Sequence, residues 1–254
     1  MGRKKNKKDP IIVYWSPDSL PFRQGQMTLL DMKPVPVMNE IRNRRTKNIK
    51  VPLTPSREIT PGNYQLCSAL HTHTENMFMI KAPFNADIKL TEDGSIETSC
   101  KYADWFGERI SSIENTFSID FDYSLYLFSE EELLVELTPP YMHKTSQPEY
   151  GFLSSVQIDI SSWFRGFVLI YQLWENKRNV FFKAGEPIGY LRFKTDRPII
   201  FKEFKVTDEL LGLAGACLNY KNIIPFIPME KLYELFHKTS MKKRVLQEIK
   251  KNTI

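Results

Sequence analysis

The chain has 254 residues, of which 42% are hydrophobic and 13% aromatic. This content is enough for a packed core and excludes a chain that is disordered throughout. The net charge is +5, and it is unevenly placed, because five basic residues gather before residue 9: Arg3, Lys4, Lys5, Lys7 and Lys8. We interpret residues 1–10 as a basic, disordered, solvated tail, which leaves the rest of the chain close to neutral.

The three cysteines, Cys67, Cys100 and Cys217, lie far apart and form no C-x-x-C pair. They therefore indicate neither a zinc knuckle nor a disulfide framework, and they favour a reducing compartment. No apolar segment follows the basic start, and no run of 18 apolar residues occurs, so we expect neither a secretory signal nor a membrane partner. The predicted location is the cytoplasm, or the host cytoplasm if the chain is phage-encoded.

The first part of the chain is a short apolar strand followed by a long proline-rich arm. Residues 11–15 are β-branched or aromatic and predict a strand. Prolines then interrupt regular structure at positions 17, 21, 34, 36, 52, 55 and 61. We assign residues 11–62 to an arm that docks on a protein partner or on a second copy of the chain. A short helix over 39–50 would carry the candidate binding cluster Arg42, Arg44, Arg45 and Lys47.

The middle of the chain predicts many strands. We expect strands over 64–70, 77–81, 86–90, 96–100 and 133–138, and an amphipathic helix over 102–113. Residues 117–124 alternate apolar and polar side chains, the pattern of a strand with one buried face, and Asp120 and Asp122 would lie on the wet face.

The densest apolar stretch, residues 156–193, is the expected centre of the core. Residues 166–174 are nearly all apolar, which predicts a strand covered on both faces. A turn over 183–187 would lead into a second buried strand, 188–193. Four residues are expected to set this geometry: Trp163 as a buried aromatic, Gly166 by close backbone approach, and Gly185 and Pro187 in the turn. We also interpret Trp15, Trp105 and Trp174 as core residues.

Three helices are predicted after residue 206. Thr207 is a fair N-cap, Pro228 begins a second helix, and Ser240 caps a third whose outer face is basic. Strands followed by helices predict a mainly β fold, an antiparallel double-sheet sandwich or distorted barrel, cupin-like or β-clip-like, with its core over 63–206 and a helical tail over 207–254.

The sharpest candidate for chemistry is His71-Thr72-His73-Thr74-Glu75. On a strand, His71 and His73 would share a face and bind one metal ion, with His143 as a third ligand. Such a site predicts a cupin-like enzyme that uses Fe, Mn or Zn. The alternative is that the histidines lie in a polar loop after Leu70 or form hydrogen bonds within the protein, and no cofactor is then expected.

Other chemistries find little support in the sequence. There is no G-x-S-x-G elbow and no phosphate-binding glycine loop. Nucleic acid stays a possible partner because the tail, the 42–50 cluster and the last helix are basic, but no RRM, KH or zinc-finger pattern is present.

Residues 161–193, SSWFRGFVLIYQLWENKRNVFFKAGEPIGYLRF, resemble the closing segment of an uncharacterised family of bacterial and marine tailed-phage proteins. The matching residues are Trp163, Ala184, Gly185, Glu186 and Pro187. The resemblance implies a β-barrel-like domain and a phage origin, and it implies no activity.

The same segment is similar to deoxyuridine-triphosphatase-like β-clip proteins. The matching residues are Phe164, Arg165, Gly166, Gly185, Ile188, Leu191 and Phe193. This resemblance implies a nucleotide-binding protein. The place of that family's catalytic aspartate is occupied here by Ser161, and Asp159 lies two positions too early.

The sequence thus predicts a non-catalytic binding or assembly module, phage-encoded. The alternatives are a metal-dependent enzyme using His71, His73 and His143, and a nucleotide-binding β-clip protein.

Overall fold

A computed structural model describes residues 9–17, 32–39, 68–91, 95–100, 106–110, 117–223 and 226–254. Several predictions lie outside these residues. They concern most of the basic tail, most of the proline-rich arm, Cys67, Trp105 and the candidate binding cluster of Arg42, Arg44, Arg45 and Lys47.

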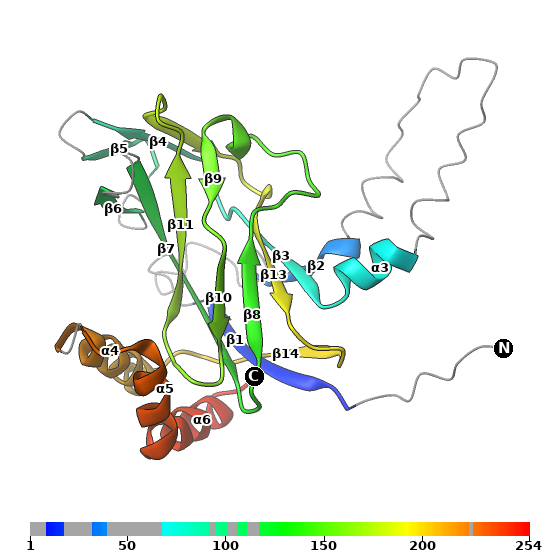
Figure 1. Cartoon of the computed structure of the whole chain (residues 1–254), viewed down its shortest axis with the longest axis vertical. Coiled ribbons are helices and arrows are strands. Elements are labelled where there is room, and N and C mark those ends of the chain that lie inside the picture. Colours follow the sequence, from blue (N-terminus) through cyan, green and yellow to red (C-terminus); the bar gives the residue numbers. More distant parts are fainter. Residues whose placement is uncertain are drawn as a thin grey trace.

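Most described strands belong to two large sheets (Figure 1). The first sheet has the order β14 (Ile199–Glu203), β1 (Ile11–Pro17), β7 (Phe117–Ser129), β11 (Gly166–Leu173) and β9 (Gly151–Leu153), and β6 (Phe106–Ile110) also pairs with β7. The second sheet has the order β10 (Val156–Asp159), β8 (Leu134–Thr138), β13 (Pro187–Phe193), β3 (Met77–Lys81) and β2 (Val35–Pro36). A small third sheet has the order β12 (Asn179–Phe182), β4 (Ala86–Leu90) and β5 (Ile96–Thr98).

The two large sheets form a sandwich around one apolar core. Val13 and Leu169 of the first sheet and Val135 and Leu191 of the second belong to the same buried cluster. Strand pairs are antiparallel except β1 with β14, which is parallel. The prediction of a mainly β, antiparallel sandwich is therefore confirmed, and the described sheets stay open rather than closing on themselves.

Strand β1 lies inside the first sheet, between β14 and β7. Val13 and Trp15 are almost completely buried. Residues 11–17, which we assigned to the arm on the basis of the prolines that follow, thus form part of the sandwich, as the strand predicted over 11–15 requires.

Burial along the strands differs from the prediction in two places. Val168 of β11 is 43% exposed, so only one face of this strand is covered. In β7, by contrast, Ser118 and Asp120 are buried, so the predicted wet face is wrong there. An apolar sequence permits a strand to be buried on both faces. Which faces are in fact covered depends on the layers that pack against the strand.

Strand β13 confirms the second buried strand of the prediction. Six of its seven residues are buried. Leu191 faces the sandwich core, while Tyr190 packs with Val37, Met77 and Met79 in a separate cluster on the outer side of the second sheet.

Two segments adopt a different secondary structure from the one predicted. Helix α3 (Ser68–Thr74) replaces the expected strands through residues 68–74, and Thr74 Oγ1 donates to the carbonyl of Leu70 at 2.8 Å inside it. Strand β6 replaces the expected helix at residues 106–110, because pairing with β7 supplies its hydrogen bonds. Apolar patterns this short do not distinguish helix from strand.

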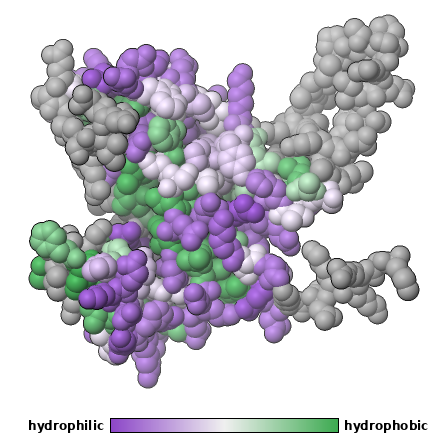
Figure 2. All heavy atoms as spheres, in the orientation of Figure 1, coloured by the Kyte–Doolittle hydropathy of each residue, from purple (hydrophilic) through white to green (hydrophobic). Residues whose placement is uncertain are grey.

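The three C-terminal helices are confirmed: α4 (Asp208–Ile223), α5 (Met229–Lys238) and α6 (Met241–Lys251). Thr207 Oγ1 accepts the backbone N–H of Leu210 at 3.2 Å, as expected of an N-cap. Ser240 occupies the N-cap position of α6, as predicted, but its side chain makes no capping hydrogen bond. The helices pack at one end of the sandwich (Figure 1), against a second cluster that includes Phe128, Trp163 and Phe164. Hydrophilic side chains cover the outward surface of α6 (Figure 2).

The turn before β13 has the predicted glycine geometry. Gly185 has a φ of +78°, and its N–H donates to the carbonyl of Ala82 at 2.8 Å. Pro187 follows as the first residue of β13, where it is buried.

The Gly185→Ala variant tests the turn. A Cβ at this position meets nothing within 4 Å, so the expected loss of about 1–2 kcal/mol in the free energy of unfolding arises from backbone strain alone. Gly212→Ala in α4, also with open space, is the matched control and should gain up to about 1 kcal/mol. Urea denaturation measures both changes. Equal effects of the same sign in the two variants would contradict the claim that position 185 requires a positive φ.

Candidate functional site

The most distinctive surface feature is a cavity of about 280 Å³ where residues 139–150 pass over the ends of β8, β9 and β11. Its walls are mainly aromatic rings and prolines. We call it the aromatic groove, and its lining residues are Pro139, Pro140, Tyr141, His143, Gln147, Pro148, Gly151, Phe152, Leu153, Tyr171 and Trp174.

Prolines and local hydrogen bonds shape the loop that frames the groove. Pro139 and Pro140 follow β8 directly, and proline cannot donate to a continuing ladder. The backbone then turns twice, with the N–H of Tyr141 donating to Pro139 O at 2.9 Å and that of His143 to Pro140 O at 3.0 Å. A short 3₁₀ helix, η3 (Gln147–Glu149), brings the chain back to β9.

The turn before β13 anchors this loop. The carboxylate oxygen Oε2 of Glu186 accepts from the backbone N–H of Ser146 at 3.3 Å and lies 3.1 Å from its hydroxyl. The Gln147 side chain donates to the carbonyl of Pro187 at 3.0 Å. Residues that the sequence indicated as turn formers thus also position the groove.

Two hydrogen bonds fix the floor and wall rings in place. The buried Tyr171 hydroxyl donates to Gln147 O, and burial raises the pKa of Tyr171 well above its ordinary value, so the hydroxyl keeps its proton. The indole N–H of Trp174 donates to Pro148 O at 3.0 Å. Since its nitrogen already bonds to the loop that frames the groove, Trp174 can contact an occupant only through its ring surface.

Trp174 and Phe152 form an exposed aromatic pair. Their ring centroids lie 5.1 Å apart, and the residues are 44% and 39% exposed. Gly151 permits this arrangement, because a Cβ there would stand 2.0 Å from the carbonyl oxygen of Gln172. The prediction that Trp174 is a core residue is wrong, whereas those for Trp15 and Trp163 are confirmed.

The predicted histidine strand is wrong, because His71 and His73 lie on helix α3. Residues two apart on a helix point about 200° away from each other, so these two do not share a face. His73 Nε2 lies 2.8 Å from the Tyr141 hydroxyl, and the buried His143 bonds through Nδ1 to the Tyr190 hydroxyl.

Two tyrosines lie between His73 and His143 and bond to them. The rings of Tyr141 and Tyr190 lie 5.3 Å apart between His73 and His143. Within the described ranges, no three or more His, Cys, Asp or Glu side chains are grouped so as to hold a metal ion. The Fe, Mn or Zn site therefore stays a prediction, without the strand geometry that suggested it.

A second polar cluster, which sequence spacing gave no signal for, joins Asp159, Ser162 and His237. The Ser162 hydroxyl donates to Asp159 Oδ2 and lies 2.8 Å from His237 Nε2, 75 positions away in sequence. The N–H and hydroxyl of Ser161 both lie 2.8 Å from Asp159 Oδ1.

This cluster does not have the order of a nucleophilic relay. A relay places histidine between the carboxylate and the serine, so that the ring accepts the hydroxyl proton. Here Ser162 lies in the middle, its hydroxyl donates a hydrogen bond to the Asp159 carboxylate, and the residue is 4% exposed. The cluster instead fastens helix α5 to the turn after β10.

The chain matches no family model, no curated protein and no solved structure in the comparisons made. The resemblances to the phage family and to the β-clip proteins accordingly stay predictions. Among the described helices, none combines the length and apolar character required to cross a membrane.

Glu186→Ala tests the anchoring of the groove. Loss of the acceptor for Ser146 should speed amide hydrogen exchange within residues 139–150 while lowering the free energy of unfolding by only about 1 kcal/mol. Lys183→Ala, an exposed change in the same turn, is the control. Unchanged exchange in the loop would show that Glu186 does not hold it.

Proposed function

We propose that the protein is a non-catalytic binding and assembly module whose aromatic groove binds an extended, proline-containing peptide. The observation that carries the proposal is the exposed pair of Trp174 and Phe152, held rigidly beside Pro139, Pro140 and Pro148. Aromatic rings are enriched at protein interaction sites, and apolar grooves with a polar rim commonly mark them.

The chemistry of the groove favours a polyproline-type ligand. Proline-rich segments bind grooves lined by aromatic rings, because their preformed helix loses little entropy and its flat rings pack on aromatic faces. The groove offers ring surface, while the nitrogen of Trp174 and the hydroxyl of Tyr171 already bond to the frame.

The proposed occupant is the arm of a second copy of the chain. Residues 52–55 are Pro-Leu-Thr-Pro, which fits the P-x-x-P pattern, and Pro61 follows. Arm exchange between copies would use the self-association that the proline-rich sequence predicts. The basic cluster of Arg42, Arg44, Arg45 and Lys47 precedes this segment and stays a predicted contact to a partner.

A non-catalytic role is supported by how the reactive side chains are used. Asp159, Ser162 and His237 fasten α5, and His73 and His143 bond to tyrosines. A hydrolase or a metal enzyme would direct such side chains at a substrate, whereas here they bond to other side chains of the protein.

Titration of the protein with a peptide of residues 51–61 tests the groove by calorimetry. The peptide should bind, and Trp174→Ala should weaken binding by about tenfold, or ~1.4 kcal/mol. A peptide that carries Pro52→Ala and Pro55→Ala should bind the parent protein no more tightly than the unchanged peptide binds the Trp174→Ala protein. Phe226→Ala removes a 96% exposed aromatic ring elsewhere and should leave the affinity unchanged.

Sedimentation velocity of the full chain tests assembly. We expect a concentration-dependent oligomer that the Pro52→Ala, Pro55→Ala variant loses. A strict monomer whose groove binds no peptide would overturn the proposal. Peptide binding without an oligomer would show that the groove's occupant is a proline-containing segment of a different protein.

The two alternatives have their own tests. A stoichiometric transition metal that is lost in His73→Ala would support the metal-dependent enzyme. Stabilisation by a deoxynucleotide, about 2.7 kcal/mol at ~100 times its dissociation constant, would support the nucleotide-binding protein.

A further inference from the structure

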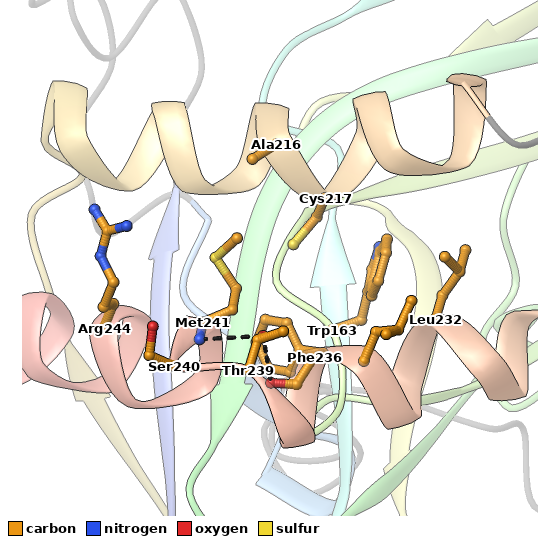
Figure 3. A pocket seen from close by; sticks show the side chains of 10 residues that line it. Trp163, Ala216, Cys217, Leu232, Phe236, Thr239, Ser240, Met241 and Arg244 are labelled. Atoms are coloured by element: carbon orange, nitrogen blue, oxygen red, sulfur yellow. Dashed lines mark hydrogen bonds between the residues drawn. The ribbon is translucent and has the colours of Figure 1, made fainter.

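The C-terminal helices line a second cavity, of about 150 Å³ and open to solvent on one side, against the turn that carries Trp163 (Figure 3). We call it the helix cavity. Its walls are mostly apolar, and its lining includes Trp163, Ala216, Cys217, Phe236, Met241 and Arg244. It shares no lining residue with the aromatic groove.

One buried donor in this cavity has no hydrogen-bond partner. Trp163 is 6% exposed, and its indole Nε1 is fully covered and bonds to no atom of the described residues, so an acceptor reaches it only when a neighbouring side chain moves. In Figure 3 this nitrogen lies on the ring edge directed toward α4 and Cys217. An unpaired buried N–H is costly, and native structures pair nearly all such groups.

The position of Trp163 is fixed by its neighbours. Its ring packs on Tyr233 and Phe236, with centroids 6.1 and 6.2 Å away. The preceding residue, Ser162, is bonded to both Asp159 and His237. The protein itself therefore sets the direction of the indole N–H.

The walls favour a neutral occupant. Burial raises the pKa of Cys217, so its thiol stays uncharged. Among the described lining residues Arg244 is the one cation, its side chain is 56% exposed, and it lies 3.7 Å from the Glu209 carboxylate. An ion taken into the cavity would lose its hydration without a buried counter-charge.

We propose that the helix cavity is a binding site for a small, neutral, apolar molecule that carries a carbonyl oxygen, and that this oxygen accepts the hydrogen bond of Trp163 Nε1. The volume sets the size, because apolar cavities of about 150 Å³ accommodate a benzene-sized molecule. The donor sets the chemistry, because a carbonyl is a neutral acceptor that pairs with a single N–H.

The probes are cyclohexanone and cyclohexane, which have similar size and differ in the acceptor. In the full chain labelled with ¹⁵N-tryptophan, cyclohexanone should move the Trp163 indole N–H resonance downfield, while cyclohexane should not. Trp163→Phe identifies that resonance. It should weaken cyclohexanone binding by about three- to tenfold and change cyclohexane binding by less than about twofold.

A second variant tests the cavity independently of the donor. Ala216→Leu places a larger side chain into the cavity from α4 and should abolish binding of both probes. Leu218→Ala, on the same helix and 44% exposed, is the matched control and should bind both as the parent chain does.

The outcomes are distinguishable. Binding that Ala216→Leu leaves intact would overturn the site. Equal movement of the indole resonance with both probes would overturn the role of Trp163 and show that solvent satisfies the donor. If Trp163→Phe does not fold, the resonance of the parent chain and the Ala216→Leu titration decide the question together.

Discussion

Burial of both faces of β13 is the constraint on which the rest of the structure depends. Leu191 completes the sandwich core on one side, and Tyr190 packs with Met77 and Met79 on the other. Because both faces are covered, the strand has one register and its preceding turn has a fixed position. That turn supplies the carboxylate of Glu186 and the carbonyl of Pro187, which hold the loop of the aromatic groove.

The two proposed binding places use tryptophan in opposite ways. In the groove, the nitrogen of Trp174 bonds to Pro148 O, so the exposed ring face is what an occupant meets. In the helix cavity, the ring of Trp163 packs against α5 and its buried nitrogen has no hydrogen-bond partner among the described residues. The groove therefore favours a ligand recognised by shape and stacking, and the cavity favours one recognised by an acceptor atom.

Serine, aspartate and histidine side chains join separate segments of the chain by hydrogen bonds. Ser162 lies between Asp159 and His237, which joins the turn after β10 to helix α5 and closes one wall of the helix cavity. His73 and His143 bond to Tyr141 and Tyr190 beside the groove. Each polar network thus lies beside one of the two proposed binding sites and fixes side chains at its wall.

Features that depend on a few neighbouring residues could be predicted from the amino-acid order. The positive φ of Gly185, the cap at Thr207 and the amphipathic α5 and α6 are of this kind, and the number of strands gave the fold class. The exposed face of Val168, the buried face of Asp120, the helix at His71 and the pairing of Ser162 with His237 were not predictable. They depend on which distant segment covers each surface, and a local pattern carries no information about a partner 75 residues away.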